Sequence, residues 1–313
     1  MGKVFKALSK SENEQPQQSL AALVVAEEEA RDAAEEQAPA DVPRRRLHRP
    51  NIEAVRTDNR SADAFDFMHF SLNAPATDAF DREASVAPAP RSASARPASE
   101  VTLDATRVDP HLVAFYDFDP RAAEEYNKTA ITMISAAADQ PLRRVLIASA
   151  QHGEGRTCVA LNLACALAQA KQRVLVIDTD LQRPSLHRLL GIEAERGVAE
   201  VVTNNLAASA ATIKVLPYGF HVLPLRERVE NSAEILASPA LREMLDDCEA
   251  QYDFMLFDSS PLLDSKDANL LMKLTHATVM VVRPGKTNAG HLSRAIAPLP
   301  EDNVFGVVLN RAS

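Results

Sequence analysis

The sequence predicts an α/β fold: a doubly wound, mainly parallel sheet with helices on both faces, preceded by a largely disordered N-terminal region. Short apolar runs alternate with helical stretches in the second part of the chain, which is typical of parallel strands covered on both faces. No glycine occurs between Gly2 and Gly153, although folded domains use glycine in tight turns and at helix ends. We therefore expect a tail at residues 1–110 and one globular domain at residues 111–313.

The composition agrees with a globular domain, and it limits the partners and the cellular location that we expect. The chain has 313 residues, of which 46% are hydrophobic and 25% charged, as in an average soluble globular protein. Its net charge is −9, so no nucleic acid is expected as a partner, because that binding depends on neutralising phosphates. No run approaches the roughly 20 apolar residues of a membrane span. We expect a cytoplasmic protein that reaches the inner face of a membrane only through a partner.

The tail contains three segments with recognisable character. Residues 1–12 are basic and amphipathic, and residues 19–37 are rich in good helix formers, so both are expected to form short helices. An apolar cluster stands in polar surroundings at Phe65, Phe67, Met68, Phe70 and Leu72. This cluster is either a docking peptide that becomes ordered on a partner or a chance apolar patch.

The domain is expected to contain five strands of the buried type. They are residues 143–149, 173–180, 252–260, 277–284 and 303–310. Helices are expected at residues 121–139, 157–170, 232–251 and 288–297. In a sheet of this kind the ligand binds at the carboxyl ends of the strands.

The first predicted strand leads through a turn with two glycines directly into a helix. Gly153 and Gly155 allow the backbone to curl with its N–H groups pointing inward, and the helix N-terminus adds positive potential. Thr157 stands where a hydroxyl binds magnesium in a phosphate-binding loop. The turn is therefore predicted to hold phosphate.

Aspartates end the next two strands. Asp178 and Asp180 follow the second strand, and Asp258 follows the third. A single aspartate at such a place is often only a helix cap. Three of them directed at one phosphate loop supply metal ligands, charge balance and a base for a hydroxyl or water nucleophile. We therefore predict a site for a nucleotide with Mg²⁺, with Thr157, Asp178 and Asp258 as the metal-binding residues.

Four segments in the right order make residues 111–313 resemble a known family. Residues 149–157 are similar to a Walker A loop, 174–191 to a second Walker A segment, 254–268 to Walker B with its following loop, and 231–245 to the helix before Walker B. The family is the bacterial tyrosine autokinases of capsule and exopolysaccharide assembly, a branch of the MinD- and ParA-like P-loop ATPases.

This resemblance implies that the nucleotide is ATP, bound with Mg²⁺, and it implies a set of site residues. Arg156, Asp178, Asp180 and Asp258 would be catalytic, and Asn310 would contact adenine. The loop that binds the nucleotide would consist of Gln151, His152, Gly153, Glu154, Gly155, Arg156, Thr157 and Cys158. It also implies ring-shaped homo-oligomers and a membrane polysaccharide copolymerase, the chain-length protein, whose cytoplasmic segment activates the kinase.

Several residues depart from the family pattern. Arg156 replaces the loop lysine, and Asn127 and Ala130 stand where the family has its ring-forming arginines. The sequence ends without a tyrosine cluster. Three hypotheses stay open: a tyrosine kinase acting on other proteins, a catalytically weak or silent nucleotide-dependent regulator or scaffold of the polysaccharide machinery, and a MinD- or ParA-like positioning ATPase. The third is disfavoured because the extra loop lysine of those proteins falls at Gln151.

Overall fold

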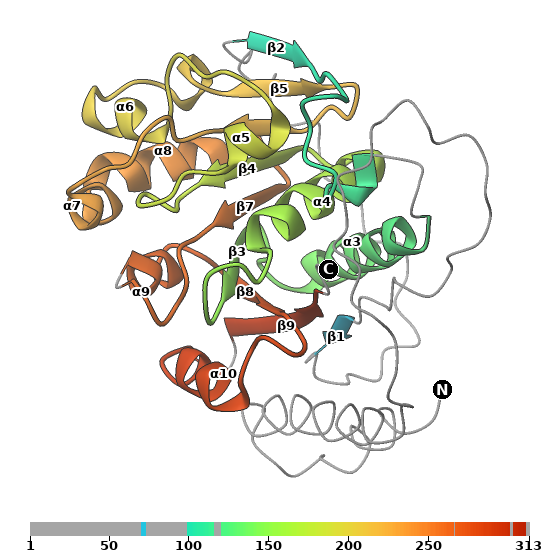
Figure 1. Ribbon diagram of the computed structural model, residues 1–313. Helices are drawn as coiled ribbons and strands as arrows, with labels where there is room; N and C mark the ends of the chain where they lie inside the picture. Colours follow the sequence, from blue (N-terminus) through green and yellow to red (C-terminus); the bar gives the residue numbers. More distant parts are fainter. Residues whose placement is uncertain (1–69, 73–98, 116–119, 266, 301–302, 311–313) are drawn as a thin grey trace, which may run out of the picture.

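A computed structural model describes residues 70–72, 99–115, 120–265, 267–300 and 303–310 (Figure 1). Its centre is a nine-stranded sheet with the order β1-β9-β8-β3-β7-β4-β6-β5-β2. The strands are β1 (Phe70–Leu72), β2 (Ser99–Thr102), β3 (Arg144–Ser149), β4 (Val174–Asp178), β5 (Ile213–Leu216), β6 (His221–Leu223), β7 (Phe254–Asp258), β8 (Ala277–Val282) and β9 (Val304–Leu309).

The central part of the sheet is parallel. Strands β9, β8, β3, β7, β4 and β6 pair in parallel, whereas β1 is antiparallel to β9 and β5 is antiparallel to β6. The five strands predicted from the sequence are all in this parallel part. The predicted fold class is therefore confirmed, and β5 and β6 are additions that the sequence pattern did not indicate.

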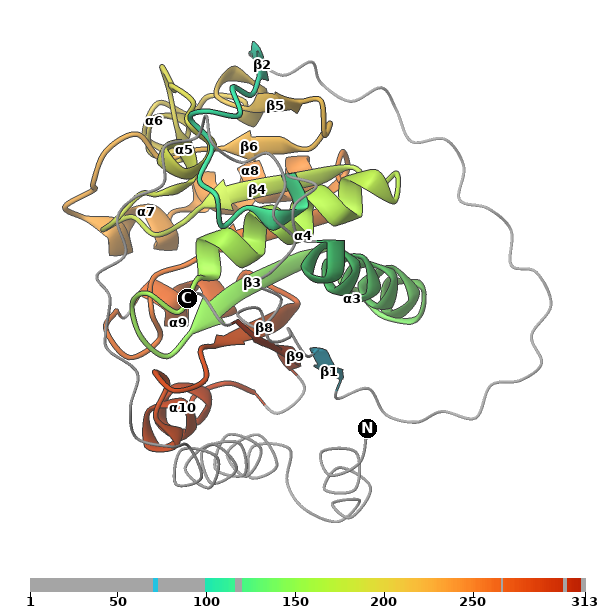
Figure 2. The ribbon, with the colours of Figure 1, turned by 45° about the vertical axis from the view of Figure 1, so that its right-hand side comes forward.

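Helices cover both faces of the sheet, and the sheet separates the hydrophobic core into two clusters. One face carries α3 (Pro120–Asp139), α4 (Arg156–Gln169) and α5 (Leu186–Leu190), together with the 3₁₀ helix η2 (Val113–Phe115). The other carries α6 (Val198–Thr203), α7 (Ser232–Ala237), α8 (Pro239–Glu249), α9 (Asp267–Met272) and α10 (Ala289–Ile296). A second 3₁₀ helix, η3, spans Ala208–Ala210. Figure 2 shows α3 and α4 in front of the strands and α8 behind them.

The alternation of side chains along each strand explains the two cores. In β4, Val174 and Val176 pack toward α4, while Leu175 and Ile177 pack toward the opposite helices. All five residues of β4 are buried. A strand that is covered on both faces needs apolar residues at every position, and this is why the predicted strands read as uninterrupted apolar runs.

One predicted helix is divided into two. Residues 232–251 were expected to form a single helix, but α7 ends before Ser238 and α8 starts at Pro239. Ser238 is extended, with ψ 144°, as the residue before a proline prefers. Its side chain accepts a hydrogen bond from Leu241 N at 3.1 Å, so Ser238 caps the second helix.

The sheet extends to residues before 111, where we expected the domain to begin. Strand β2 pairs with β5 and β1 pairs with β9, so both sheet edges come from the front part of the chain. Val108, between β2 and α3, is also buried. Phe70 and Leu72 of the apolar cluster lie in β1, whereas the helices expected at residues 1–12 and 19–37 and the other members of the cluster lie outside the described residues. None of the described helices combines the length and apolarity needed to cross a bilayer.

Candidate functional site

The predicted site residues meet at one edge of the parallel sheet. Strands β3, β7 and β4 are neighbours, and Asp178 and Asp258 are directly paired in the register of β4 and β7. The turn after β3 leads into α4 at the same edge (Figure 1). The structure therefore brings the phosphate loop, residues 151–158, together with the aspartates that end the two neighbouring strands.

The phosphate loop has the backbone shape that an anion needs. Gly153 and Gly155 have φ values of +75° and +93°, in the left-handed region that glycine adopts without strain. Within the described part of the chain, the N–H groups of Gly153, Gly155 and Thr157 have no hydrogen-bond partner. Unpaired N–H groups at the start of α4, a helix of 14 residues, form a cradle for phosphate oxygens.

Glu154 holds the phosphate loop in place from inside the protein. Its carboxylate is buried and accepts hydrogen bonds from Gln151 N at 2.9 Å and from Thr287 Oγ1 at 2.5 Å. Thr287 belongs to the segment after β8. This connection could not be predicted from the sequence, because the two residues lie on separate strand-to-helix turns.

Arg156 does not extend into the cradle. Its guanidinium is 7% exposed and donates hydrogen bonds to Ser259 O at 2.8 Å, to Ser149 Oγ, and to Gln151 O at 3.1 Å. Asp180 Oδ2 lies 3.6 Å from Arg156 Nη2. Burial lowers the pKa of Arg156, and the neighbouring Asp258 and Asp180 oppose this.

Of the three residues predicted to bind a metal, Thr157 contacts Asp258 directly, and Ser185 links Thr157 to Asp178. The Thr157 hydroxyl donates to Asp258 Oδ2 at 2.7 Å and lies 2.9 Å from Ser185 Oγ. Asp178 Oδ2 accepts from the backbone N–H groups of Ser185 and Leu186. Ser185 was not among the predicted residues, since a serine in a turn has no distinctive spacing.

The two carboxylates at this point are buried and incompletely paired. Asp178 Oδ1 and Asp258 Oδ1 have no hydrogen-bond partner in the structure. Burial raises the pKa of Asp258 to about 7, although Arg156 and the Thr157 hydroxyl act to lower it. Burial and the charge of Asp258 raise the pKa of Asp178 well above its usual value. Unpaired carboxylate oxygens in such a place are strong ligands for a divalent cation.

These residues fit Mg²⁺ better than a metal held by protein ligands alone. Among the described residues there is no group of three or more His, Cys, Asp or Glu that could hold an ion. Mg²⁺ typically binds one or two carboxylates and completes its shell with water and substrate phosphates. Asp178, Asp258 and the Thr157 hydroxyl, next to a phosphate cradle, match that pattern.

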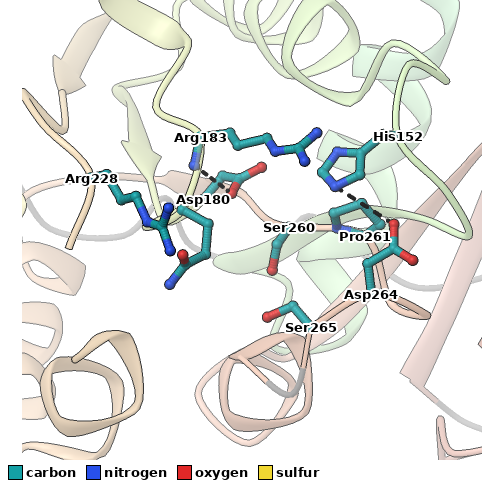
Figure 3. Close-up of a pocket in the computed structure, with 9 residues that line it drawn as sticks. His152, Asp180, Arg183, Arg228, Ser260, Pro261, Asp264 and Ser265 are labelled. Atoms are coloured by element: carbon teal, nitrogen blue, oxygen red, sulfur yellow. Dashed lines mark hydrogen bonds and ion pairs between the residues drawn. The ribbon is translucent and has the colours of Figure 1, made fainter. Parts of the chain in front are cut away.

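A cavity of about 340 Å³ opens beside the phosphate loop (Figure 3). Its lining consists of His152, Asp180, Gln182, Arg183, Arg228, Ser260, Pro261, Asp264 and Ser265. The Arg183 guanidinium points toward His152, whose Nε2 lies 3.5 Å from Asp264 Oδ2. Burial raises the pKa of Asp180, which Arg156 partly offsets. The cavity thus presents a carboxylate of increased basicity next to the loop.

Two further predicted residues, Asn310 and Cys158, lie next to the loop or at its end. Asn310 follows β9, and its Nδ2 donates to Glu154 O at 2.9 Å, so the residue expected to contact adenine touches the loop itself. Cys158 is half-buried in the first turn of α4, and burial raises the pKa of its thiol to about 12. A thiol with that pKa is not a nucleophile at neutral pH.

Comparison with known proteins agrees with this fold. The model of the AAA domain matches residues 142–290. Tyrosine-protein kinase YwqD of Bacillus subtilis is 28% identical over 207 residues, which are 66% of this chain and 87% of that protein. Putative tyrosine-protein kinase AmsA of Erwinia amylovora is 30% identical over 58% of this chain, which spans only 25% of AmsA. The kinase domain of Escherichia coli tyrosine kinase ETK has a TM-score of 0.60 at 25% identity, over 64% of this chain and 79% of that domain.

The fold and the site together define a P-loop protein of the ATPase class. Within that class, the resemblance predicted from the sequence is confirmed. The chain is similar to bacterial tyrosine-protein kinases both in sequence and in fold.

Proposed function

We propose that this protein binds ATP with Mg²⁺ at the phosphate loop and acts as a tyrosine kinase in the synthesis and export of extracellular polysaccharide. The observation that carries the proposal is the phosphate cradle beside two buried carboxylates whose oxygens are unpaired. Bound Mg²⁺ would neutralise charge on the transferring phosphate. The polysaccharide role, like the partner, comes from the family resemblance.

Each residue has a definite part in this proposal. The N–H groups of residues 152–158 would bind the phosphates, and Asn310 would lie on the adenine side of the loop. Thr157, Asp178 and Asp258 would hold the metal. The acceptor hydroxyl would enter the cavity of Figure 3, where Asp180 can take its proton.

A specific observation favours a second candidate, a regulator that binds ATP but transfers phosphate slowly. The positive charge of Arg156 is engaged by protein oxygens and by Asp180. It is thus less able to stabilise the charge that develops during phosphoryl transfer. In either role, the partner we propose is the cytoplasmic segment of a membrane polysaccharide copolymerase, at which this protein would gather on the inner face of the membrane.

The nucleotide site is tested by thermal unfolding of the purified chain. ATP with Mg²⁺ at 100 times its Kd is expected to stabilise the folded state by about 2.7 kcal/mol. Thr157→Val, which keeps the shape of the side chain but removes its hydroxyl, should lose the part of the Tm shift that depends on Mg²⁺. An unchanged Tm at millimolar ATP and Mg²⁺ would contradict the proposal.

The two candidates differ in where the label from labelled ATP is found after incubation. Incubation with and without the cytoplasmic segment of a candidate copolymerase should give phosphotyrosine for a kinase. A regulator of the second kind gives binding without label on protein and with little free phosphate. Rapid phosphate release without phosphotyrosine would instead support a positioning ATPase.

A further inference from the structure

The positive charge of Arg156 is committed to the interior of the protein. Its acceptors are Ser149 Oγ, Gln151 O and Ser259 O, and Asp180 lies within ion-pair distance. A guanidinium that is bound by several oxygens and nearly excluded from solvent has few donors left for a ligand. The cradle therefore needs another source of positive charge if it is to hold several phosphates.

A second cation contacts the phosphate loop from the segment after β8. Lys286 Nζ donates to His152 O at 2.8 Å and lies 3.3 Å from Gly153 O, which is also 3.3 Å from Arg283 Nη1. The Lys286 side chain is exposed. A Cβ atom added to Gly153 would lie 2.5 Å from Lys286 Nζ, so glycine at this position leaves room for the ammonium group.

The segment that carries Lys286 is fixed against the loop. Thr287 Oγ1 donates to the buried Glu154 carboxylate and accepts a hydrogen bond from Arg283 N at 2.9 Å. The N–H groups of Lys286 and Thr287 both donate to Arg283 O, which closes the turn. The position of the ammonium group is thus set by a turn that is itself hydrogen-bonded to the phosphate loop.

Lys286 can act on a bound phosphate across a single peptide group. Each carbonyl that it contacts belongs to a peptide group whose N–H, on Gly153 or Glu154, is part of the cradle. A carbonyl that accepts a hydrogen bond from a cation polarises its peptide group and makes the N–H a stronger donor. The charge of the ammonium group adds a direct attraction, which grows with the charge of the ligand.

We propose that Lys286 is the residue that supplies the phosphate loop with positive charge for a nucleoside triphosphate, in place of a lysine within the loop. This inference depends on the proposed nucleotide site and identifies what sets its affinity for triphosphate over diphosphate. Lys286 is a positioning residue in this role, because it acts through the peptide groups of residues 152–154.

The test compares the affinities of the full chain for ATP and ADP, each with Mg²⁺, by isothermal titration calorimetry. Lys286→Gln, which keeps a hydrogen-bond donor but removes the charge, should weaken ATP binding about tenfold and ADP binding about threefold. Lys286→Arg should stay close to the parent for both nucleotides. The matched control is Lys273→Gln. Lys273 is an exposed lysine that precedes β8, so it lies near the N-terminal end of that strand, whereas the site lies at the carboxyl ends of the strands. ATP affinity should fall more steeply with salt in the parent than in Lys286→Gln.

Different results overturn different claims. If the parent binds ATP and Lys286→Gln binds it equally well, the inference is wrong and the nucleotide site stands. An equal loss for ATP, ADP and AMP would assign Lys286 a purely structural role and would also overturn it. A parent that binds no ATP refutes the proposed function itself. Should Lys286→Gln melt below the assay temperature, Lys286→Ala and the salt dependence of the parent decide the question.

Discussion

At position 156, arginine and lysine would use their positive charge differently. The planar guanidinium of Arg156 fits oxygens in several directions at once, and here it joins β3, the phosphate loop and the segment after β7. A lysine has one compact ammonium group and cannot reach Ser149, Gln151 and Ser259 together. The arginine therefore stabilises the loop through these hydrogen bonds, and a lysine would be freer to approach a phosphate.

Arg156→Lys is accordingly expected to raise phosphate transfer or ATP hydrolysis and to lower the Tm. Loss of hydrogen bonds from buried polar groups should destabilise the fold by about 1–3 kcal/mol. Labelled-ATP turnover and thermal unfolding measure the two effects, with Arg242→Lys on the exposed side of α8 as the control. If Arg156→Lys binds ATP and its rate is no higher than that of the parent, the arginine is not what limits the chemistry.

Most residues of the candidate site could be predicted from the sequence, for a reason that also explains the omissions. The glycines, Thr157 and the aspartates lie on short motifs directly after strands, so local order along the chain reveals them. Thr287 and Lys286 contact the loop from more than 130 positions away. Nothing in their own segment marks them, because their role depends on β8 lying beside β3 in the sheet.

At the scale of the elements, adjacent β4 and β7 force two carboxylates together. Asp178 and Asp258 end neighbouring strands in register, in a part of the protein that solvent does not reach. Without a metal, the folded protein must either hold a proton at this pair or leave charged groups buried. The pairing of two strands thereby couples stability to pH and to Mg²⁺.

We predict that stability without Mg²⁺ falls as pH rises from about 4 to about 7 because of this pair. An aspartate has a pKa of about 3.9 when unfolded, while burial raises the pKa of Asp258 to about 7 in the folded state. The folded protein binds more protons between these values, so it is favoured at the acidic end and loses that advantage as pH rises. Asp258→Asn should remove much of the loss and be more stable than the parent at pH 8 by at least about 1 kcal/mol.

Urea unfolding at pH 5 and pH 8, with and without Mg²⁺, measures this effect. Mg²⁺ should stabilise the parent more at pH 8, because it binds the ionised carboxylates, and should have little effect on Asp258→Asn. Asp139→Asn, at the exposed end of α3, is the control. A parent and an Asp258→Asn variant with the same pH dependence would show that the pair carries no proton.

The strands also show which secondary structure can be predicted from the sequence and which cannot. The strands of the central sheet have five or six residues, apart from the short β6, and consist of apolar runs with polar residues mainly at their ends, so their pattern is unambiguous. Strands β5 and β6 have four and three residues and are partly exposed, so they lack both length and an apolar run. Strands β1 and β2 lie in polar and low-complexity surroundings, and they become strands because β9 and β5 offer an open edge.

At the scale of the whole molecule, residues 99–110 belong to the packing of the domain. Leu103 N donates to Leu216 O and Asp109 N donates to Leu189 O, each at 3.1 Å or less. Val101 and Leu103 are half-buried against the core, and Val108 is buried within it. Residues 1–98 contribute only β1 to the described structure.

We therefore propose that the domain begins near residue 99 and predict different results for two shortened chains. A chain that begins at residue 99 should keep the ATP-dependent Tm shift and nearly the same Tm. A chain that begins at residue 111 should lose about 3 kcal/mol through the apolar contacts of Val101, Leu103 and Val108. Thermal unfolding of both, beside the full chain, measures the difference, and equal Tm values would place the boundary at 111 after all.

The placement of β1 and β2 also has a consequence for solubility. A parallel sheet that ends in a long, flat strand exposes a row of unpaired N–H and C=O groups, on which a second molecule can add its own strand. Here β9 is followed by the three-residue β1, and β5 by the four-residue β2. Strands this short offer few such groups, so the front part of the chain ends the sheet on both sides and discourages the growth of fibrous aggregates from either edge.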